Sequence, residues 1–383
     1  MLSGIVVGCS SSTDNQSNLV GPPPFVFRKL ELEQKKADGE LDWKLSSPEA
    51  RYELLRRLVR AKQPIGILYN NNKPSFQVRA DFAVVVNDGE QIMLEGDVQL
   101  QQMNGNKILI KGDRLRWIPE LSRLVMEQNP KAFDDQSRIS ATVAILQQDT
   151  NQLTLTGPVQ LDRWKDKFAF KNQPDTAIRT GQASWNLDSG SLKAAGPVLG
   201  QRRDQEGVVL EQLDGQQLIG NTKQGVITVK APVIVTMPQN KGLLQARDTS
   251  WDFRQQTLSS KEPFQGLIRQ TQINGESFFV ELAENSVRIP AGCRIQQPGE
   301  QLQARECSWN WSTDEVMATG GVRVQRDQNK QITEAETLEG TVGEEGSLLF
   351  SAPGQKVRSQ VVIDQDIKDP TPRPKRSQPP IRF

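Results

Sequence analysis

Histidine is absent from this chain of 383 residues, and that absence removes several kinds of chemistry. No Ser-His-Asp or Cys-His nucleophile can form, and no metal can be held by an imidazole. The 47 basic and 46 acidic residues leave a net charge of +1, so the chain lacks the basic surplus that nucleic-acid binding needs. The sequence contains no P-loop or dinucleotide fingerprint and no apolar run long enough to cross a bilayer.

One class of enzyme is compatible with this composition. Aspartate and glutamate are plentiful, and a pair of carboxylates on a parallel β-helix can hydrolyse a polysaccharide. No carboxylate cluster stands out from the solvent-facing background, however. The basic pairs Arg56-Arg57 and Arg202-Arg203 could meet an anionic headgroup, although solvated strand faces explain each pair more simply. We therefore expect a protein that is not an enzyme and that uses no cofactor and no metal.

What the chain does contain is a repeat of about 32 residues. Each unit has two apolar residues in alternate positions, then a hinge residue, then a further apolar residue. The hinges are Pro64, Asp97, Pro130, Pro158, Pro197, Pro232, Pro263, Gly292, Gly321 and Pro353. Alternation of this kind is typical of half-buried strands, and such a period indicates stacked supersecondary units. The sequence therefore predicts an all-β array of about ten units.

The apolar positions of one parity are predicted to face a common interior. Aromatic residues add a second rhythm, because they lie twelve or thirteen positions before alternate hinges. These rings either pack the core or line a groove for apolar chains, and the pattern leaves both interpretations open. The candidate interior residues are Ile92, Leu94, Val98, Leu153, Leu155, Val159, Ile227, Val229, Val233, Trp117, Trp185 and Trp251.

The two ends of the chain differ from the repeat. Val6-Val7-Gly8-Cys9 fits a bacterial lipobox, so Cys9 is the predicted lipidation site, and a polar tether follows to residue 24. Only eight residues precede Cys9, and none is basic, so either the true start lies upstream of Met1 or the match is accidental. Residues 364–383 are rich in proline and charge and are predicted to form a disordered tail.

The other two cysteines lie 14 positions apart on neighbouring units. In an exported protein Cys293 and Cys307 would meet an oxidising environment and could form a disulfide. The alternative is two separate buried thiols, with Cys293 taking the place of the valine found in other units.

Three segments follow one another in an order that resembles the LptC family of periplasmic bridge proteins in lipopolysaccharide export. They are Asp42-Trp43-Lys44-Leu45, then Phe76-Gln77-Val78-Arg79-Ala80-Asp81, then Ile92-Met93-Leu94-Glu95-Gly96-Asp97-Val98. The later run Leu153-Thr154-Leu155-Thr156-Gly157-Pro158-Val159 is similar to LptA/OstA-like repeats. We accordingly predict an LptC-like β-domain over 25–163 and OstA-like repeats over 164–363.

The resemblance implies two antiparallel sheets folded like a taco, or β-jellyroll, with an apolar trough between them. It implies a periplasmic, membrane-anchored protein that passes lipopolysaccharide-type glycolipid from an inner-membrane ABC exporter towards the outer membrane. Its edge strands would pair with the exporter complex and with other β-taco bridge proteins. If each unit adds one strand to each sheet, ten units make a stack of about 50 Å.

The chain departs from the family in length and in anchor. LptC proteins are usually about half as long and are held by a transmembrane helix, whereas a lipobox stands in its place here. Two alternatives to a lipid bridge stay open: a structural or carbohydrate-binding β-solenoid, and a β-helical polysaccharide enzyme.

Overall fold

The computed structural model describes residues 24–105, 108–328, 330–342 and 346–362. The predicted lipidation site Cys9, the tether up to residue 23 and the tail from residue 364 lie outside this range. The chain divides into two compact units, residues 1–128 and 129–383. The predicted boundary after residue 163 does not coincide with this division, because it falls at the end of a strand inside the second unit.

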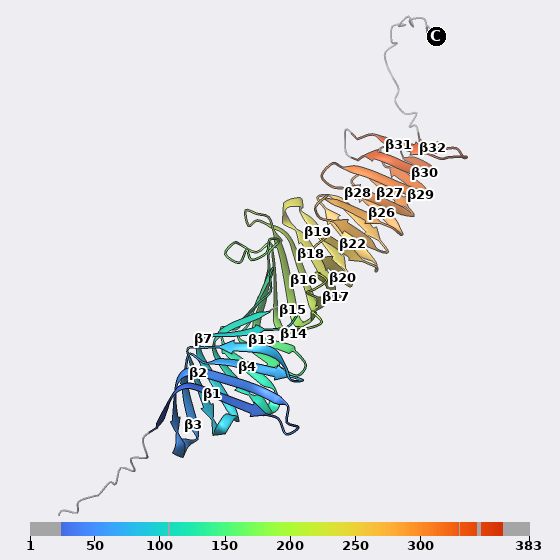
Figure 1. The fold of residues 1–383 in the computed structure, drawn as a ribbon. Coiled ribbons are helices and arrows are strands. Elements are labelled where there is room, and N and C mark those ends of the chain that lie inside the picture. Colours follow the sequence, from blue (N-terminus) through green and yellow to red (C-terminus); the bar gives the residue numbers. More distant parts are fainter. Residues whose placement is uncertain (1–23, 106–107, 329, 343–345, 363–383) are drawn as a thin grey trace, which may run out of the picture. The chain divides into compact units, whose positions relative to one another are not determined.

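The described part of the first unit is built from nine strands and three short 3-10 turns, and Figure 1 labels several of these strands. The strands are β1 (Phe25–Lys35), β2 (Leu41–Glu53), β3 (Leu58–Lys62), β4 (Ile65–Asn70), β5 (Lys73–Arg79), β6 (Phe82–Val86), β7 (Gln91–Gln102), β8 (Leu109–Ile118) and β9 (Arg123–Gln128). The 3-10 turns are η1 (Leu54–Arg56), η2 (Asn87–Gly89) and η3 (Pro119–Leu121).

Long strands belong to two sheets at once. The first half of β2 pairs with β4 and its second half pairs with β3, all antiparallel. In the same way the first half of β7 pairs with β6 and its second half pairs with β5. One sheet therefore contains β3, β6 and halves of the long strands, and the other contains β4, β5 and the remaining halves. We call the line along which the long strands change sheet the crease, and the opposite side of the unit the mouth.

The crease lies at the hinges that the sequence repeat marks. In β7 the pairing register shifts between Glu95 and Val98, and Gly96 there has a φ of +79°. An ideal Cβ on Gly96 would lie 2.4 Å from a carboxylate oxygen of Asp81, so glycine is required both by the left-handed backbone and by the close approach. Backbone hydrogen bonds continue across the crease, since the Asp81 N–H donates to the Gly96 carbonyl at 2.9 Å.

The second unit repeats this pattern with the remaining strands, which succeed one another from green to red in Figure 1. It contains β10 (Lys131–Phe133), β11 (Ser137–Ser140), β12 (Val143–Gln147), β13 (Gln152–Arg163), β14 (Thr176–Asn186), β15 (Ser191–Arg203), β16 (Val209–Asn221), β17 (Val226–Lys230), β18 (Val233–Met237), η4 (Pro238–Asn240), β19 (Gly242–Ala246), β20 (Thr249–Asp252), β21 (Thr257–Ser260) and β22 (Phe264–Ile268). It continues with β23 (Thr271–Gly275), β24 (Phe278–Glu281), β25 (Ser286–Ile289), β26 (Cys293–Gln297), β27 (Glu300–Ala304), β28 (Glu306–Asn310), β29 (Glu315–Arg326), β30 (Gln331–Thr341), β31 (Leu348–Ser351) and β32 (Arg358–Gln360).

Two kinds of crease occur in this unit. β13, β15 and β29 run through the crease with a register shift, as β7 does. At other hinges the strand breaks into two; at Pro232, for example, β17 ends before the proline and β18 begins after it. The halves then pair separately, β17 with β20 and β18 with β19.

The all-β fold is confirmed, but the expectation of one strand per sheet in each repeat is wrong. Between the hinges Asp97 and Pro130 the chain places the second half of β7 and the first half of β8 in one sheet. It then places the second half of β8 and β9 in the other. Each repeat thus adds two strands to each sheet and lengthens a stack by about 10 Å rather than about 5 Å. Alternation shows which side chains face inward, but it does not show how often the strand reverses within one repeat.

Candidate functional site

The interior between the two sheets is the candidate site in each unit. All twelve predicted interior residues lie there, and none is more than 4% exposed. Alternate side chains point the other way: Leu94 of β7 is fully buried, whereas its neighbour Glu95 is exposed. An interior lined in this way offers apolar contact along its length and can hold an apolar chain by burial alone.

Two tryptophans close the mouth of the first unit. Trp43 lies on the half of β2 that pairs with β4, and Trp117 lies on the half of β8 that pairs with β9. Their rings meet edge to face with centroids 5.5 Å apart. The sheets therefore meet here through side-chain packing, while their backbones pair with other strands. Both indole N–H groups are buried and have no hydrogen-bond acceptor among the described residues.

In the second unit the interior is filled by side chains from both sheets. Phe264 of β22 and Phe278 of β24, on opposite sheets, have ring centroids 4.9 Å apart. Beside them lies an apolar cavity of about 20 Å³, lined by residues such as Val235, Leu258 and Trp311. That volume holds about one water molecule, far less than the 300–1,000 Å³ of a ligand pocket.

A disulfide joins the two sheets at the crease. Cys293 begins β26 and Cys307 lies at the start of β28, and their Cα atoms are 5.9 Å apart. Both residues are buried. The bond ties the sheets at the closed side of the interior and leaves the mouth unconstrained.

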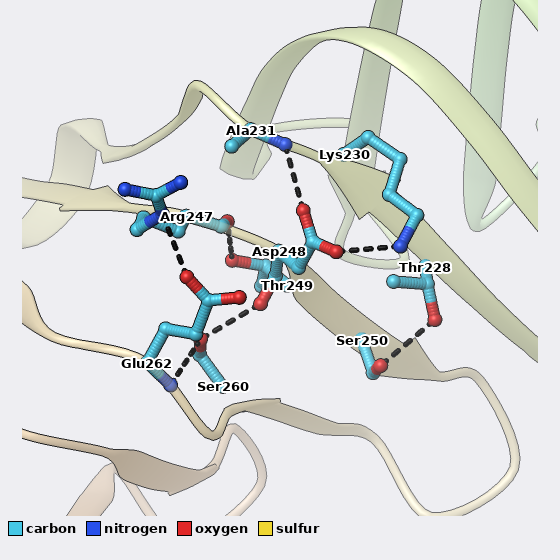
Figure 2. A network of polar contacts seen from close by, with 9 residues as sticks. All are labelled: Thr228, Lys230, Ala231, Arg247, Asp248, Thr249, Ser250, Ser260 and Glu262. Atoms are coloured by element: carbon cyan, nitrogen blue, oxygen red, sulfur yellow. Dashed lines mark hydrogen bonds and ion pairs between the residues drawn. The ribbon is translucent and has the colours of Figure 1, made fainter.

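Hydrogen bonds from polar side chains connect neighbouring strands on the outer side of the crease, as Figure 2 shows around Asp248. The Asp248 carboxylate accepts a hydrogen bond from the Lys230 ammonium at 2.5 Å and another from the Ala231 N–H at 3.0 Å. These two donors stabilise the ionised form and lower the pKa of Asp248 below its ordinary value. Ser260 donates to the Asp248 carbonyl at 2.7 Å, which links the next strand to the same network.

Two buried tryptophans were not among the sequence candidates, Trp43 in the interior and Trp164 beneath the loop that follows β13, where its ring meets Phe170 and its indole N–H donates to the Asn172 carbonyl. Trp43 lies two positions before Leu45 in the first segment that resembles the LptC family. Alternate residues of a strand face the same way, so this spacing could have predicted that Trp43 faces inward. Trp164 follows directly after β13 and is 2% exposed, but it stands outside the repeat and no periodicity marks it. Across the described parts of the chain there is also no cluster of three potential metal ligands.

The geometry defines the class of protein: a folded antiparallel sheet of the β-taco type, enclosing an apolar interior. Residues 1–125 match the LptC family model, described as lipopolysaccharide-assembly, LptC-related. The match confirms the LptC resemblance for the first unit and ends three residues before that unit does. The LptC family provides the bridge in lipopolysaccharide transport. No curated protein matches the chain. No helix in the described ranges is long and apolar enough to span a membrane.

Proposed function

We propose that this protein is a periplasmic lipid bridge that holds the acyl chains of a lipopolysaccharide-type glycolipid between its sheets and passes them along the stack. The observation that supports this most directly is the apolar interior, which recurs at every repeat of both units. The mechanism needs no reacting group. An inner-membrane ABC exporter would drive each glycolipid into the bridge, and the next one would push it onward.

Loading requires the two sheets to part at the mouth, because the interior is filled by side chains. At the crease the sheets share covalent strands and backbone hydrogen bonds, whereas at the mouth side chains such as Trp43 and Trp117 meet. Apolar contact is non-directional, so an acyl chain can replace the contact between the two rings without breaking a hydrogen bond. The carbonyl at the root of an acyl chain would also supply an acceptor for the buried indole N–H groups.

Site-specific photo-crosslinking tests the interior. A benzophenone side chain at Leu94, Leu155 or Val229, each at most 1% exposed, is expected to capture glycolipid in cells. The matched controls are the adjacent, outward positions Met93, Thr154 and Thr228. Capture at the outward positions only would refute the proposal.

We place the partners at the free edges. Among the residues that the structure describes, β1 pairs with β2 alone, so its other edge would offer backbone groups to a partner strand. A Glu31→Pro substitution removes one N–H from this strand and is expected to abolish exporter binding while pairing at the far end of the chain persists. If the variant keeps both partners, pairing through this edge is wrong.

Anchoring through Cys9 is a separate part of the proposal. Cys9 is expected to incorporate radiolabelled palmitate in cells, and Cys9→Ser is expected to abolish labelling and release the protein from membranes. Labelling that survives the substitution would contradict the lipobox assignment.

The closed interior also favours a second candidate, a structural or carbohydrate-binding solenoid, which needs no space between its sheets. Mass spectrometry of lipid that co-purifies with the protein separates the two. A bridge carries glycolipid through purification in mild detergent, and a solenoid does not.

A further inference from the structure

A cleft of about 460 Å³ opens on the second unit, and its lining differs from the apolar interior. It lies where the end of β13, the end of β15 and the turn after β20 come together. Its volume is within the range of small-ligand sites. The basic residues that line it are Arg163, Lys165, Arg202, Arg203 and Arg254.

Three of these arginines have neutral partners. Arg163 donates to the Ser137 hydroxyl at 3.1 Å and to the Gln136 side-chain oxygen at 3.2 Å. Arg203 donates to the side-chain oxygen of Gln201, and Arg254 to the backbone carbonyl of Lys223. Arg202 differs, because it forms an ion pair with Glu211.

The carboxylates around the cleft are engaged with the backbone or with another cation. Asp175 accepts the Lys165 N–H at 2.6 Å, and Asp204 accepts the Val208 N–H at 2.8 Å. Asp134 accepts the backbone N–H groups of residues 136 and 137, and Asp135 pairs with Lys167. The carboxylates keep their charge in these bonds, but the lining carries five basic side chains against only the two carboxylates of Asp175 and Asp204, so the cleft holds an excess of positive charge.

The positive charges of the cleft also act on one another. Burial is the main cause that lowers the pKa of Arg163; Asp134 and Asp135 oppose it, and repulsion from Arg254 adds to it. The guanidinium stays protonated at neutral pH. An anion in the cleft would offset the repulsion from Arg254.

The ring of Trp251 connects this cleft to the interior. Trp164 and Trp251 line it and are 2% and 3% exposed. Trp251 belongs to the sheet of β17 and β21, and its ring lies 3.4 Å from an ideal Cβ on Gly200 of β15, in the opposite sheet. One face of Trp251 thus borders the basic cleft while its ring packs between the sheets. The cleft thus joins a basic surface to an apolar one.

We infer that this cleft binds the phosphate groups of the glycolipid headgroup while the acyl chains lie between the sheets beside Trp251. The inference rests on the proposed function and adds to it a headgroup site on the second unit. Guanidinium groups suit phosphate because their paired N–H donors match two of its oxygens.

The test compares three probes in detergent at 150 mM salt: bisphosphorylated lipid A, the same lipid with both phosphates removed, and inorganic phosphate alone. The variants are Arg203→Gln, Arg254→Gln and the two combined, since Arg254 is exposed and Arg203 is half-buried. Arg163→Gln is made as well, with folding checked by circular dichroism. We expect the double variant to bind the bisphosphorylated lipid at least tenfold more weakly and the dephosphorylated lipid as the unchanged protein does.

Arg179→Gln is the matched control. Arg179 is exposed on the neighbouring strand β14, has a glutamine partner in Gln160 at 3.4 Å and lies outside the cleft. Its loss removes the same charge and should leave all three affinities unchanged.

Each other outcome refutes a distinct statement. Equal binding of both lipids by the unchanged protein would overturn the headgroup site and leave the lipid bridge standing. Failure to bind either lipid would overturn the bridge and the headgroup site together. Inorganic phosphate binding as tightly as the lipid would show that the cleft serves a free anion instead.

Discussion

Reduction of the Cys293–Cys307 disulfide provides a quantitative test of how the two sheets are held together. The bond closes a loop spanning a sequence separation of 14 residues. In the chain-entropy model a loop of this size stabilises the folded state by about 3 kcal/mol. Because each repeat contacts only its neighbours, we expect this loss to be concentrated in the strands around the bond.

Hydrogen exchange with mass spectrometry measures this effect, with and without a reducing agent. Peptides covering β26–β28 should lose protection by about two orders of magnitude, since about 1.4 kcal/mol corresponds to a factor of ten. Peptides covering β14 and β15 serve as the internal control and should not change.

Two results would refute the reasoning. A protection loss spread equally over both regions would mean that the second unit unfolds as one cooperative body. A disulfide-mapping digest without a linked Cys293–Cys307 peptide would remove the premise itself. The bond lies at the crease, so its reduction should leave crosslinking of glycolipid at Val229 intact.

Three further predictions concern the crease and the mouth. Asp248→Asn should destabilise the protein by about 1 kcal/mol at pH 7, because it loses the charge-assisted bond to Lys230. Because the pKa of Asp248 is lowered in the folded state, its ionised side chain stabilises the protein at pH values above its ordinary pKa of 3.8. This stabilisation is lost as the pH falls through the pKa of the folded state. The urea midpoints of the variant and the parent protein should therefore converge in acid. If the two midpoints still differ in acid, the ion pair between Asp248 and Lys230 is not the cause of the difference. Gly96→Ala should cost about 1–3 kcal/mol in urea unfolding, because it combines a φ of +79° with a clash against Asp81, and an unchanged midpoint would show that the crease tolerates a side chain. Trp117→Ala should cost about 3–5 kcal/mol by the same assay, and a loss below about 1 kcal/mol would contradict its place in the core.

The strand pattern shows how far sequence reasoning reached. Alternation alone predicted that Leu94, Leu155 and Val229 face inward, and all three are buried. The hinges were also visible, because a strand that bends into a second sheet needs a left-handed residue or a proline at the bend. Pairing was not visible, so the number of strands that each repeat adds was underestimated.

The basic cleft shows what sequence reasoning missed. Its arginines come from positions 163, 202, 203 and 254. The pair Arg202-Arg203 was a possible contact for an anionic headgroup, but a solvated strand face was the simpler interpretation, and nothing in the sequence connected the pair to Arg163 or Arg254. Their partners Gln136, Ser137 and Gln201 are neutral, and no spacing rule identifies a neutral partner in advance.

The sequence by itself determined the all-β class, the inward parity and the places where the strands bend. These are local properties, set by alternation along one strand and by the backbone freedom of single residues. Only the tertiary structure decided which strands pair, that Trp43 and Trp117 close the mouth of the first unit, and that arginines far apart in the chain share one cleft. Those features depend on which strands pair, and therefore on how many strands separate two residues in the stack. The alternation of residues along a single strand contains no information about that separation.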